Sequence, residues 1–212
     1  MKKTEGLLTT YKTIKNTIRK RLSELALNWN KSEKHIFAEL AFCICTPLSK
    51  AVHCNEAVNK LEKSGVLFTG NDKQMKAFLQ KVRFNNHKSK YILTAREFLT
   101  ENGKLSIKKR IDVKNIYKTR EWFADNVKGI GFKEASHFLR NIGFGSTLAI
   151  LDVHVLKNLC DFGVIKRVPD PVSRKAYIEI ERKMKIFSKK IGIPMIEMDL
   201  LLWHNETGCI VK

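Results

Sequence analysis

Gly129 and Gly131 stand one residue apart, between two stretches of helical patterning. Glycine adopts backbone conformations with positive φ and admits a close neighbour, because it has no Cβ. Apolar residues at helical spacing flank the pair, at Tyr117, Trp122 and Phe123 before it and at Ala135, Phe138, Leu139 and Ile142 after it. The sequence therefore predicts a helix, a tight Gly-x-Gly hairpin and a second helix.

The start of the second predicted helix suits a phosphate group. Its first amides have no partner within the helix, and the positive end of the helix dipole lies there. Lys128, Gly129 and Gly131 are the predicted phosphate-binding residues of the hairpin, and Lys133 falls in the first turn of the helix. A surface lysine that grips phosphate is one interpretation of Lys133.

The charge of the chain favours a polyanionic partner. Lys and Arg number 40 against 21 Asp and Glu, which gives a formal net charge of +19. Such an excess favours nucleic acid or an acidic membrane surface; a lysine-rich but merely solvated surface is the alternative. No apolar run approaches the roughly 20 residues that span a bilayer, and no apolar signal core follows the first residues.

Cysteine usage argues against a disulfide framework and against a structural metal. The five cysteines are scattered, odd in number and without a C-x-x-C pair: Cys43, Cys45, Cys54, Cys160 and Cys209. Disulfide-rich domains and zinc sites need paired or closely spaced cysteines. We therefore expect a reduced, cytoplasmic protein that needs no metal and no organic cofactor.

The remaining pattern is helical and predicts an all-α fold. Ser32 and Asp152 are expected to cap helices, and Thr46, which precedes Pro47, to end the helix that Ser32 begins. The other expected helices cover residues 9–29, 51–64, 72–81, 115–126, 153–161, 173–191 and 194–205, with one more that ends near Asn102-Gly103. Because apolar and polar residues do not alternate over any convincing run, no sheet is predicted.

Two segments around the glycine pair resemble the hairpin region of the helix-hairpin-helix DNA glycosylases. Residues 127–135 read Val-Lys-Gly-Ile-Gly-Phe-Lys-Glu-Ala, and residues 151–154 read Leu-Asp-Val-His. Lys128 stands where the family pattern has proline, which adds a cation beside the phosphate site. Residues 39–51 and 82–92 resemble the upstream blocks of the small archaeal-type 8-oxoguanine DNA glycosylases, and the similarity extends over about residues 36–212.

This resemblance implies an architecture of two helical subdomains with a DNA-binding cleft between them. Residues 30–151 would form the central subdomain, ending in the hairpin region. Residues 1–29 and 152–212 would form the other. The implied partner is double-stranded DNA that contains 8-oxoguanine, bound by a monomer that has no membrane association.

For Lys133 the resemblance implies a nucleophile instead of a phosphate grip. A lysine amine attacks only when it is neutral, which partial burial and an adjacent helix N-terminus both favour. Attack on C1′ of the deoxyribose would release the damaged base and leave a Schiff base. The imine acidifies the C2′ proton, so the strand then breaks by β-elimination.

Asp152 follows Lys133 by 19 residues, a spacing that allows both side chains to face one pocket. One interpretation makes Asp152 a helix N-cap alone. The other keeps the cap and adds a carboxylate that stabilises the cationic sugar as the glycosidic bond breaks. The two interpretations are compatible, because an N-cap holds its carboxylate rigidly.

Four further residues are candidates for substrate contacts. A site that rejects guanine should offer an acceptor to the N7–H of 8-oxoguanine, and the resemblance implies this role for Lys212. Trp203 is a candidate wall for the extruded base, with core packing as the alternative. Phe84 or His87 could fill the gap in the opened duplex, although Phe84 could equally be a core residue.

The predicted function is a base-excision-repair DNA glycosylase for 8-oxoguanine with AP lyase activity. One alternative keeps the fold and changes the lesion to another oxidised or alkylated base. Another is a non-catalytic helix-hairpin-helix DNA-binding protein, in which Lys133 only contacts phosphate. The presence of both Lys133 and Asp152 disfavours that alternative, since binding alone requires neither.

Overall fold

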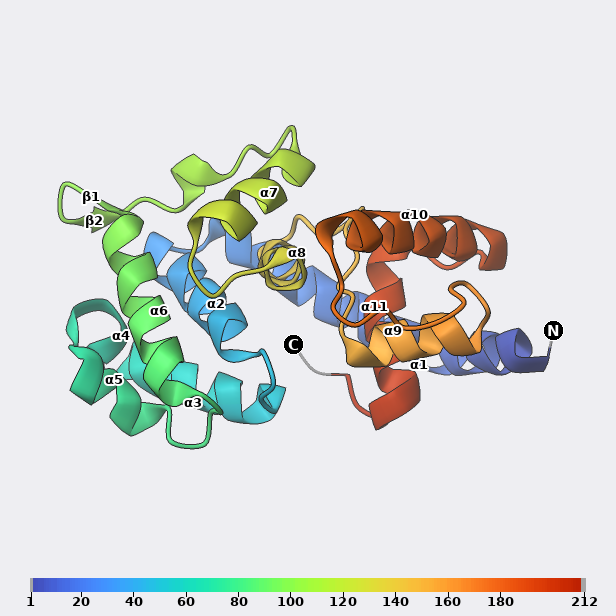
Figure 1. Ribbon diagram of the computed structural model, residues 1–212, viewed down its shortest axis with the longest axis horizontal. Helices are drawn as coiled ribbons and strands as arrows, with labels where there is room; N and C mark the ends of the chain where they lie inside the picture. Colours follow the sequence, from blue (N-terminus) through green and yellow to red (C-terminus); the bar gives the residue numbers. More distant parts are fainter. Residues whose placement is uncertain (1, 211–212) are drawn as a thin grey trace.

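The computed structural model describes residues 2–210, and helices dominate it (Figure 1). In chain order the elements are α1 (Lys2–Ala26), η1 (Leu27–Asn30), α2 (Glu33–Cys45), α3 (Ala51–Lys63), α4 (Val66–Thr69), α5 (Asp72–Phe78), α6 (Asn85–Phe98), β1 (Thr100–Glu101), β2 (Lys104–Leu105), η2 (Lys108–Arg110), α7 (Ile116–Asn126), α8 (Phe132–Asn141), α9 (Val153–Asp161), α10 (Arg174–Ile191) and α11 (Met195–Thr207). The predicted all-α fold is confirmed, with two strands of two residues each as an addition.

Polar side chains fix the first turns of several helices. Ser32 precedes α2 and accepts a hydrogen bond from the amide of His35 at 3.3 Å; Asp152 precedes α9 and accepts one from the amide of Val155 at 2.8 Å. Such caps satisfy amides that a helix leaves unpaired and contribute about 1 kcal/mol each. Both predicted caps are confirmed, as is the end of α2 before the proline.

The first helix starts earlier than its pattern predicts. It begins at Lys2 and not at Thr9, because buried side chains continue its apolar face toward the N-terminus. Leu7 and Tyr11 belong to that face, and the Tyr11 hydroxyl donates to Glu197 of α11 at 2.7 Å. Packing against α11 therefore extends the helix.

Asn102 and Gly103 form a turn where the sequence predicts the end of a helix. α6 ends earlier, at Phe98, and the turn joins β1 to β2, with Thr100 paired to Leu105. Both turn residues have positive φ, 49° and 73°. Asn-Gly is the dipeptide that adopts this geometry most readily in two-residue hairpins, and this local preference decides the structure here.

Two hydrophobic clusters make up the core. The first is built from α2, α3, α5, α6, α7 and α8, and the second from α1, α9, α10 and α11. α8 contributes to both, since Phe138 and Leu139 pack in the first cluster and Phe132 in the second. In Figure 1, α8 accordingly lies between the two groups of helices. The first turn of α8 is thus held where the clusters meet.

Buried polar contacts link the two groups of helices and the segments between them. The Arg120 guanidinium of α7 donates to Glu181 of α10 at 2.6 Å, and the same carboxylate accepts from the amide of Ala149 at 2.7 Å. Asn141, at the end of α8, donates to Glu39 of α2 at 3.0 Å. Removing one partner of a buried ion pair leaves the other charge buried and unpaired, which lowers the stability of the fold by about 3–5 kcal/mol. These contacts therefore help to fix how α7, α8 and α10 sit around the hairpin.

We propose that the chain divides into two helical subdomains, and the two clusters support this division. One subdomain would comprise residues 30–151, and the other residues 1–29 and 152–212. Phe132, Ala149 and Leu151 cross that division, because they pack in the second cluster.

Within residues 2–210, no helix is long and apolar enough to cross a membrane. In the same part of the chain, no group of three or more His, Cys, Asp or Glu is arranged to hold a metal ion.

Candidate active site

The hairpin between α7 and α8 is closed by its own backbone. The amide of Ile130 donates to the carbonyl of Val127 at 3.1 Å, and Gly129 between them has a φ of 89°. Gly131 is the N-cap of α8, in extended backbone, and both Gly131 and Lys128 are exposed. The predicted helix-hairpin-helix arrangement is present, with the three predicted phosphate-binding residues in its loop.

Gly129 packs closely against α6. A Cβ at this position would lie 2.5 Å from Cδ2 of Tyr91, and the amine of Lys128 lies 5.7 Å from the centroid of the same ring. The His87 ring lies 6.3 Å from it, centroid to centroid. Tyr91 is therefore the contact through which α6 supports the hairpin, and only glycine fits beside it.

Replacing Gly129 by Ala is expected to lower the free energy of unfolding by about 1–3 kcal/mol, because the positive φ disfavours a side chain and Tyr91 must move. Gly103→Ala is the matched control, since Gly103 has a φ of 73° but nothing within 4 Å of an added Cβ. Chemical denaturation of both variants measures the difference. Equal losses in the two variants would contradict a specific contact with Tyr91.

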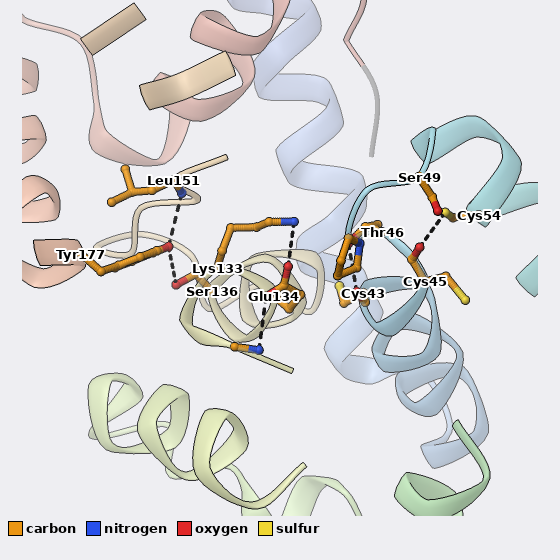
Figure 2. Close-up of polar contacts among 12 residues, drawn as sticks. Cys43, Cys45, Thr46, Ser49, Cys54, Lys133, Glu134, Ser136, Leu151 and Tyr177 are labelled. Carbon is orange, nitrogen blue, oxygen red and sulfur yellow. Dashed lines mark hydrogen bonds and ion pairs between the residues drawn. The ribbon is translucent and has the colours of Figure 1, made fainter. Parts of the chain in front are cut away.

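Lys133 lies in the first turn of α8, as predicted, and its amine pairs with the next residue. Lys133 Nζ lies 3.0 Å from Glu134 Oε1, and Figure 2 shows the two groups facing each other. The side chain of Lys133 is 24% exposed and that of Glu134 is 13% exposed. The other oxygen of Glu134 accepts from the amide of Gly131 at 3.2 Å. The Lys133 side chain is therefore largely buried but remains partly open to solvent.

Asp152 is close enough to Lys133 for their charges to interact. Burial raises the pKa of Asp152 above its ordinary value, while the hydrogen bond from the amide of Val155 and the positive charge of Lys133 act to lower it. An amine and a carboxylate from two different helix N-termini thus lie within electrostatic range of each other. That the two side chains face one pocket stays a prediction from their 19-residue spacing.

A second carboxylate, which the sequence analysis missed, interacts electrostatically with Asp152. Asp199 of α11 is buried, and the Arg140 guanidinium lies 3.6 Å from it. Burial raises the pKa of Asp199; the charge of Arg140 opposes this shift and the charge of Asp152 adds to it. Two acidic residues, Glu197 and Asp199, interrupt the apolar stretch of residues 193–203. Nothing local in the sequence indicates which of the two approaches Asp152.

Trp203 lies on the Asp152 side of the site. Its ring meets that of His154 edge to face, with centroids 4.6 Å apart, and His154 stands two residues after Asp152. The indole Nε1–H of Trp203 is buried and has no hydrogen-bond partner among the described residues. Lys212, the other predicted base-recognition residue, lies outside the described residues.

A hollow of about 240 Å³ lies next to the hairpin, lined by Ile44, Pro47, Leu48, Phe84, His87, Lys88, Tyr91 and Gly129. Two exposed apolar side chains border it, Phe84 at 53% exposure and Leu48 at 69%. Both have positive φ, 59° and 54°, which is uncommon for residues other than glycine. The interpretation of Phe84 as a core residue is therefore wrong. His87 is also exposed and lines the same hollow.

Lys88 is a buried cation that the sequence analysis did not single out. Its amine donates to the carbonyls of Cys45 and Pro47 at 2.7 Å and 2.6 Å, and to the hydroxyl of Ser49 at 2.9 Å. Burial lowers the pKa of Lys88. This lysine holds the loop between α2 and α3, which carries the strained and exposed Leu48.

Residues 18–193 match the family model described as 8-oxoguanine DNA glycosylase. An 8-oxoguanine DNA glycosylase/AP lyase of Fusobacterium nucleatum is 43% identical over 204 residues, which cover 95% of this chain and 94% of the relative. The protein of the same description from Methanocaldococcus jannaschii is 33% identical over 200 residues, covering 94% of this chain and 93% of the relative.

Solved structures show the same arrangement of helices. The crystal structure of the Methanocaldococcus jannaschii 8-oxoguanine glycosylase/lyase in complex with 15mer DNA containing 8-oxoguanine matches with a TM-score of 0.90 and 31% identity, over 100% of both chains. The 8-oxoguanine DNA glycosylase of Thermotoga maritima matches with a TM-score of 0.87 and 29% identity, over 100% of this chain and 99% of that one.

Proposed function

The chain belongs to the 8-oxoguanine DNA glycosylase family, and we propose that Lys133 is its nucleophile and Asp152 the carboxylate that supports it. The protein is a bifunctional base-excision-repair enzyme, which removes 8-oxoguanine from DNA and then cleaves the strand as an AP lyase. One observation carries the proposed roles. Lys133 in the first turn of α8 and Asp152 at the N-cap of α9 lie close enough for their charges to interact.

In the proposed reaction the neutral amine of Lys133 forms a bond to C1′ of the damaged nucleotide. The bond from C1′ to the base breaks, its electron pair goes to the base, and the base takes up a proton. Opening of the sugar gives an imine between Lys133 and C1′. Loss of the C2′ proton then expels the 3′ phosphate by β-elimination, and water hydrolyses the imine to free Lys133.

The proposed role of Asp152 is electrostatic. Positive charge develops on the sugar while the bond to the base breaks, and a fixed carboxylate in a partly dry site stabilises that charge. The cap on α9 holds the carboxylate rigidly, so little reorganisation is needed during the reaction. This placement also buries the carboxylate, and the burial raises the pKa of Asp152.

Phosphate binding and duplex opening are proposed to use the hairpin loop and the hollow next to it. Lys128, Gly129 and Gly131 would bind a backbone phosphate at the start of α8. Phe84 and His87, beside them at the hollow, would occupy the gap that an extruded nucleotide leaves. Because phosphate contacts release counterions, binding should weaken steeply with salt.

We propose that Trp203 stacks on the extruded base and that Lys212 supplies the acceptor for its N7–H. Trp203→Ala is expected to slow removal of 8-oxoguanine by about 5- to 150-fold, since stacking on an aromatic ring contributes about 1–3 kcal/mol per base. Single-turnover base release measures this loss.

Deletion of Lys212 is the companion variant, and it should reduce selectivity over guanine without altering thermal unfolding. Unchanged rates and selectivity would contradict both roles.

The protein is further proposed to act in the cytoplasm as a monomer on double-stranded DNA. Both hydrophobic clusters are built from residues of one chain. The net charge of +19 suits a polyanionic partner.

Incision of matched duplexes tests the proposed function. Duplexes with 8-oxoguanine, guanine or an alkylated base at one position are incubated with the protein, and products are compared with and without alkali. We expect strand cleavage without alkali at 8-oxoguanine alone. Cleavage at the alkylated base instead would overturn the substrate. Cleavage that always requires alkali would overturn the lyase, and tight binding without base release would leave a DNA-binding protein.

A further inference from the structure

The carboxylate of Glu134 joins the nucleophile to the hairpin. One oxygen lies 3.0 Å from Lys133 Nζ, and the other accepts from the amide of Gly131 at 3.2 Å. Glu134 is the ion-pair partner of Lys133 among the described residues, whereas Asp152 acts on Lys133 only through its charge. The nucleophile therefore rests against Glu134 and not against the carboxylate proposed to support catalysis.

We propose that Glu134 is a positioning residue that holds the amine of Lys133 in an ion pair in the free protein, so that attack requires this ion pair to open. This inference rests on the proposed function of Lys133. A carboxylate in contact stabilises the charged form of an amine, and the charged form has no electron pair to attack with. When the pair opens, the ammonium releases its proton to water and the neutral amine faces the substrate.

Charged and titratable groups from three other elements surround the same amine. They are Asp152 at the start of α9, Lys88 on α6 and Cys54 on α3, each of which interacts electrostatically with Lys133. The positive charge of Lys88 disfavours a second cation nearby, whereas the negative charge of Asp152 favours one. Glu134 differs from all of them because it alone is in direct contact.

Bound DNA offers a physical reason for the ion pair to open. The amide of Gly131, which Glu134 occupies in the free protein, belongs to the loop proposed to bind phosphate. A phosphate at this loop competes for the amide and repels the carboxylate. Phosphate binding at the hairpin would thereby free Lys133 for attack, which links recognition of the strand to activation of the nucleophile.

Competitive labelling of amines in the free protein tests the ion pair without any DNA chemistry. Lysines are methylated reductively over a range of pH, and mass spectrometry follows the peptide that contains Lys133. In Glu134→Gln the amide oxygen can still accept from Gly131, but the charge is gone. We expect the labelling midpoint of Lys133 to move toward acid, so that Lys133 is labelled roughly threefold faster than in wild type on the acidic side of the midpoint.

Glu121→Gln is the matched control, because Glu121 is exposed on α7 and its replacement changes the net charge equally. Its labelling profile at Lys133 should follow wild type. Thermal unfolding verifies that both variants fold. A Glu134→Gln midpoint that coincides with those of wild type and Glu121→Gln would overturn the inference, and so would an equal shift in both variants.

The pH profile of single-turnover cleavage separates this inference from the proposed function. If wild type cleaves 8-oxoguanine DNA, the rising limb of the Glu134→Gln profile should shift toward acid together with the labelling midpoint. A lower rate at every pH with an unmoved limb would contradict the inference. If wild type forms no product while the labelling midpoint still shifts, the proposed function fails and the ion pair stands.

Discussion

Lys133→Gln is expected to abolish the covalent adduct that borohydride traps between the protein and 8-oxoguanine DNA. Glutamine has no nucleophilic amine, so no Schiff base forms. Release of the base should slow on the order of 10³-fold or more, as when other enzymes lose a covalent nucleophile. The fold should tolerate the change within about 0.5 kcal/mol, since the side chain is not in the core. Gel-resolved trapping and single-turnover base release measure both effects.

Lys128→Gln is the matched control, because it removes the same charge from the exposed hairpin loop. It should weaken binding to all duplexes and lower their salt dependence, yet retain the adduct at saturating protein. Normal trapping by Lys133→Gln would refute the assigned nucleophile. Loss of the adduct in both variants at saturation would show that the charge of the hairpin matters, not the amine of Lys133.

Asp152→Asn is expected to slow base release by about 10²–10³-fold, the usual loss when one preorganised stabilising group is removed. Asparagine caps helices about as well as aspartate, so the amide of Val155 keeps an acceptor and α9 keeps its first turn. The variant therefore removes the charge and spares the fold. Single-turnover base release and chemical denaturation, run on the same preparation, measure the two properties.

Asp152→Ala completes the comparison, because it removes the cap as well as the charge. It should lose about 1 kcal/mol of stability beyond the asparagine variant, with a similar loss of rate. If Asp152→Asn released base as fast as wild type, Asp152 would be a helix cap alone. A loss of rate that simply followed the loss of stability would lead to the same conclusion.

Local signals account for what the sequence predicted correctly. The glycine pair requires a turn that only a residue without Cβ can make, and positive φ at Gly129 and its contact with Tyr91 fit that requirement. Ser32 and Asp152 cap helices through side chains two or three residues from the amides they bind. Such short-range chemistry does not depend on the rest of the fold. The placement of Lys133 in the first turn of α8 follows from it.

Residues missed by the sequence analysis act through contacts between distant segments. Lys88 looks like any other lysine of a basic loop, and only the packing of α6 against the loop after α2 buries its amine. Asp199 approaches Asp152 because α11 packs on α9. The exposure of Leu48 likewise depends on a loop held from another helix. None of these relations has a local pattern in the chain.

The most direct test of the account is to map the attachment site of the reduced adduct. Protein trapped with borohydride on 8-oxoguanine DNA is digested with protease and nuclease, and mass spectrometry locates the modified side chain. The account predicts the sugar remnant on Lys133 and on no other lysine. A remnant on Lys88, on Lys128 or on the N-terminal amine would contradict the proposed mechanism, even if the substrate were 8-oxoguanine as expected.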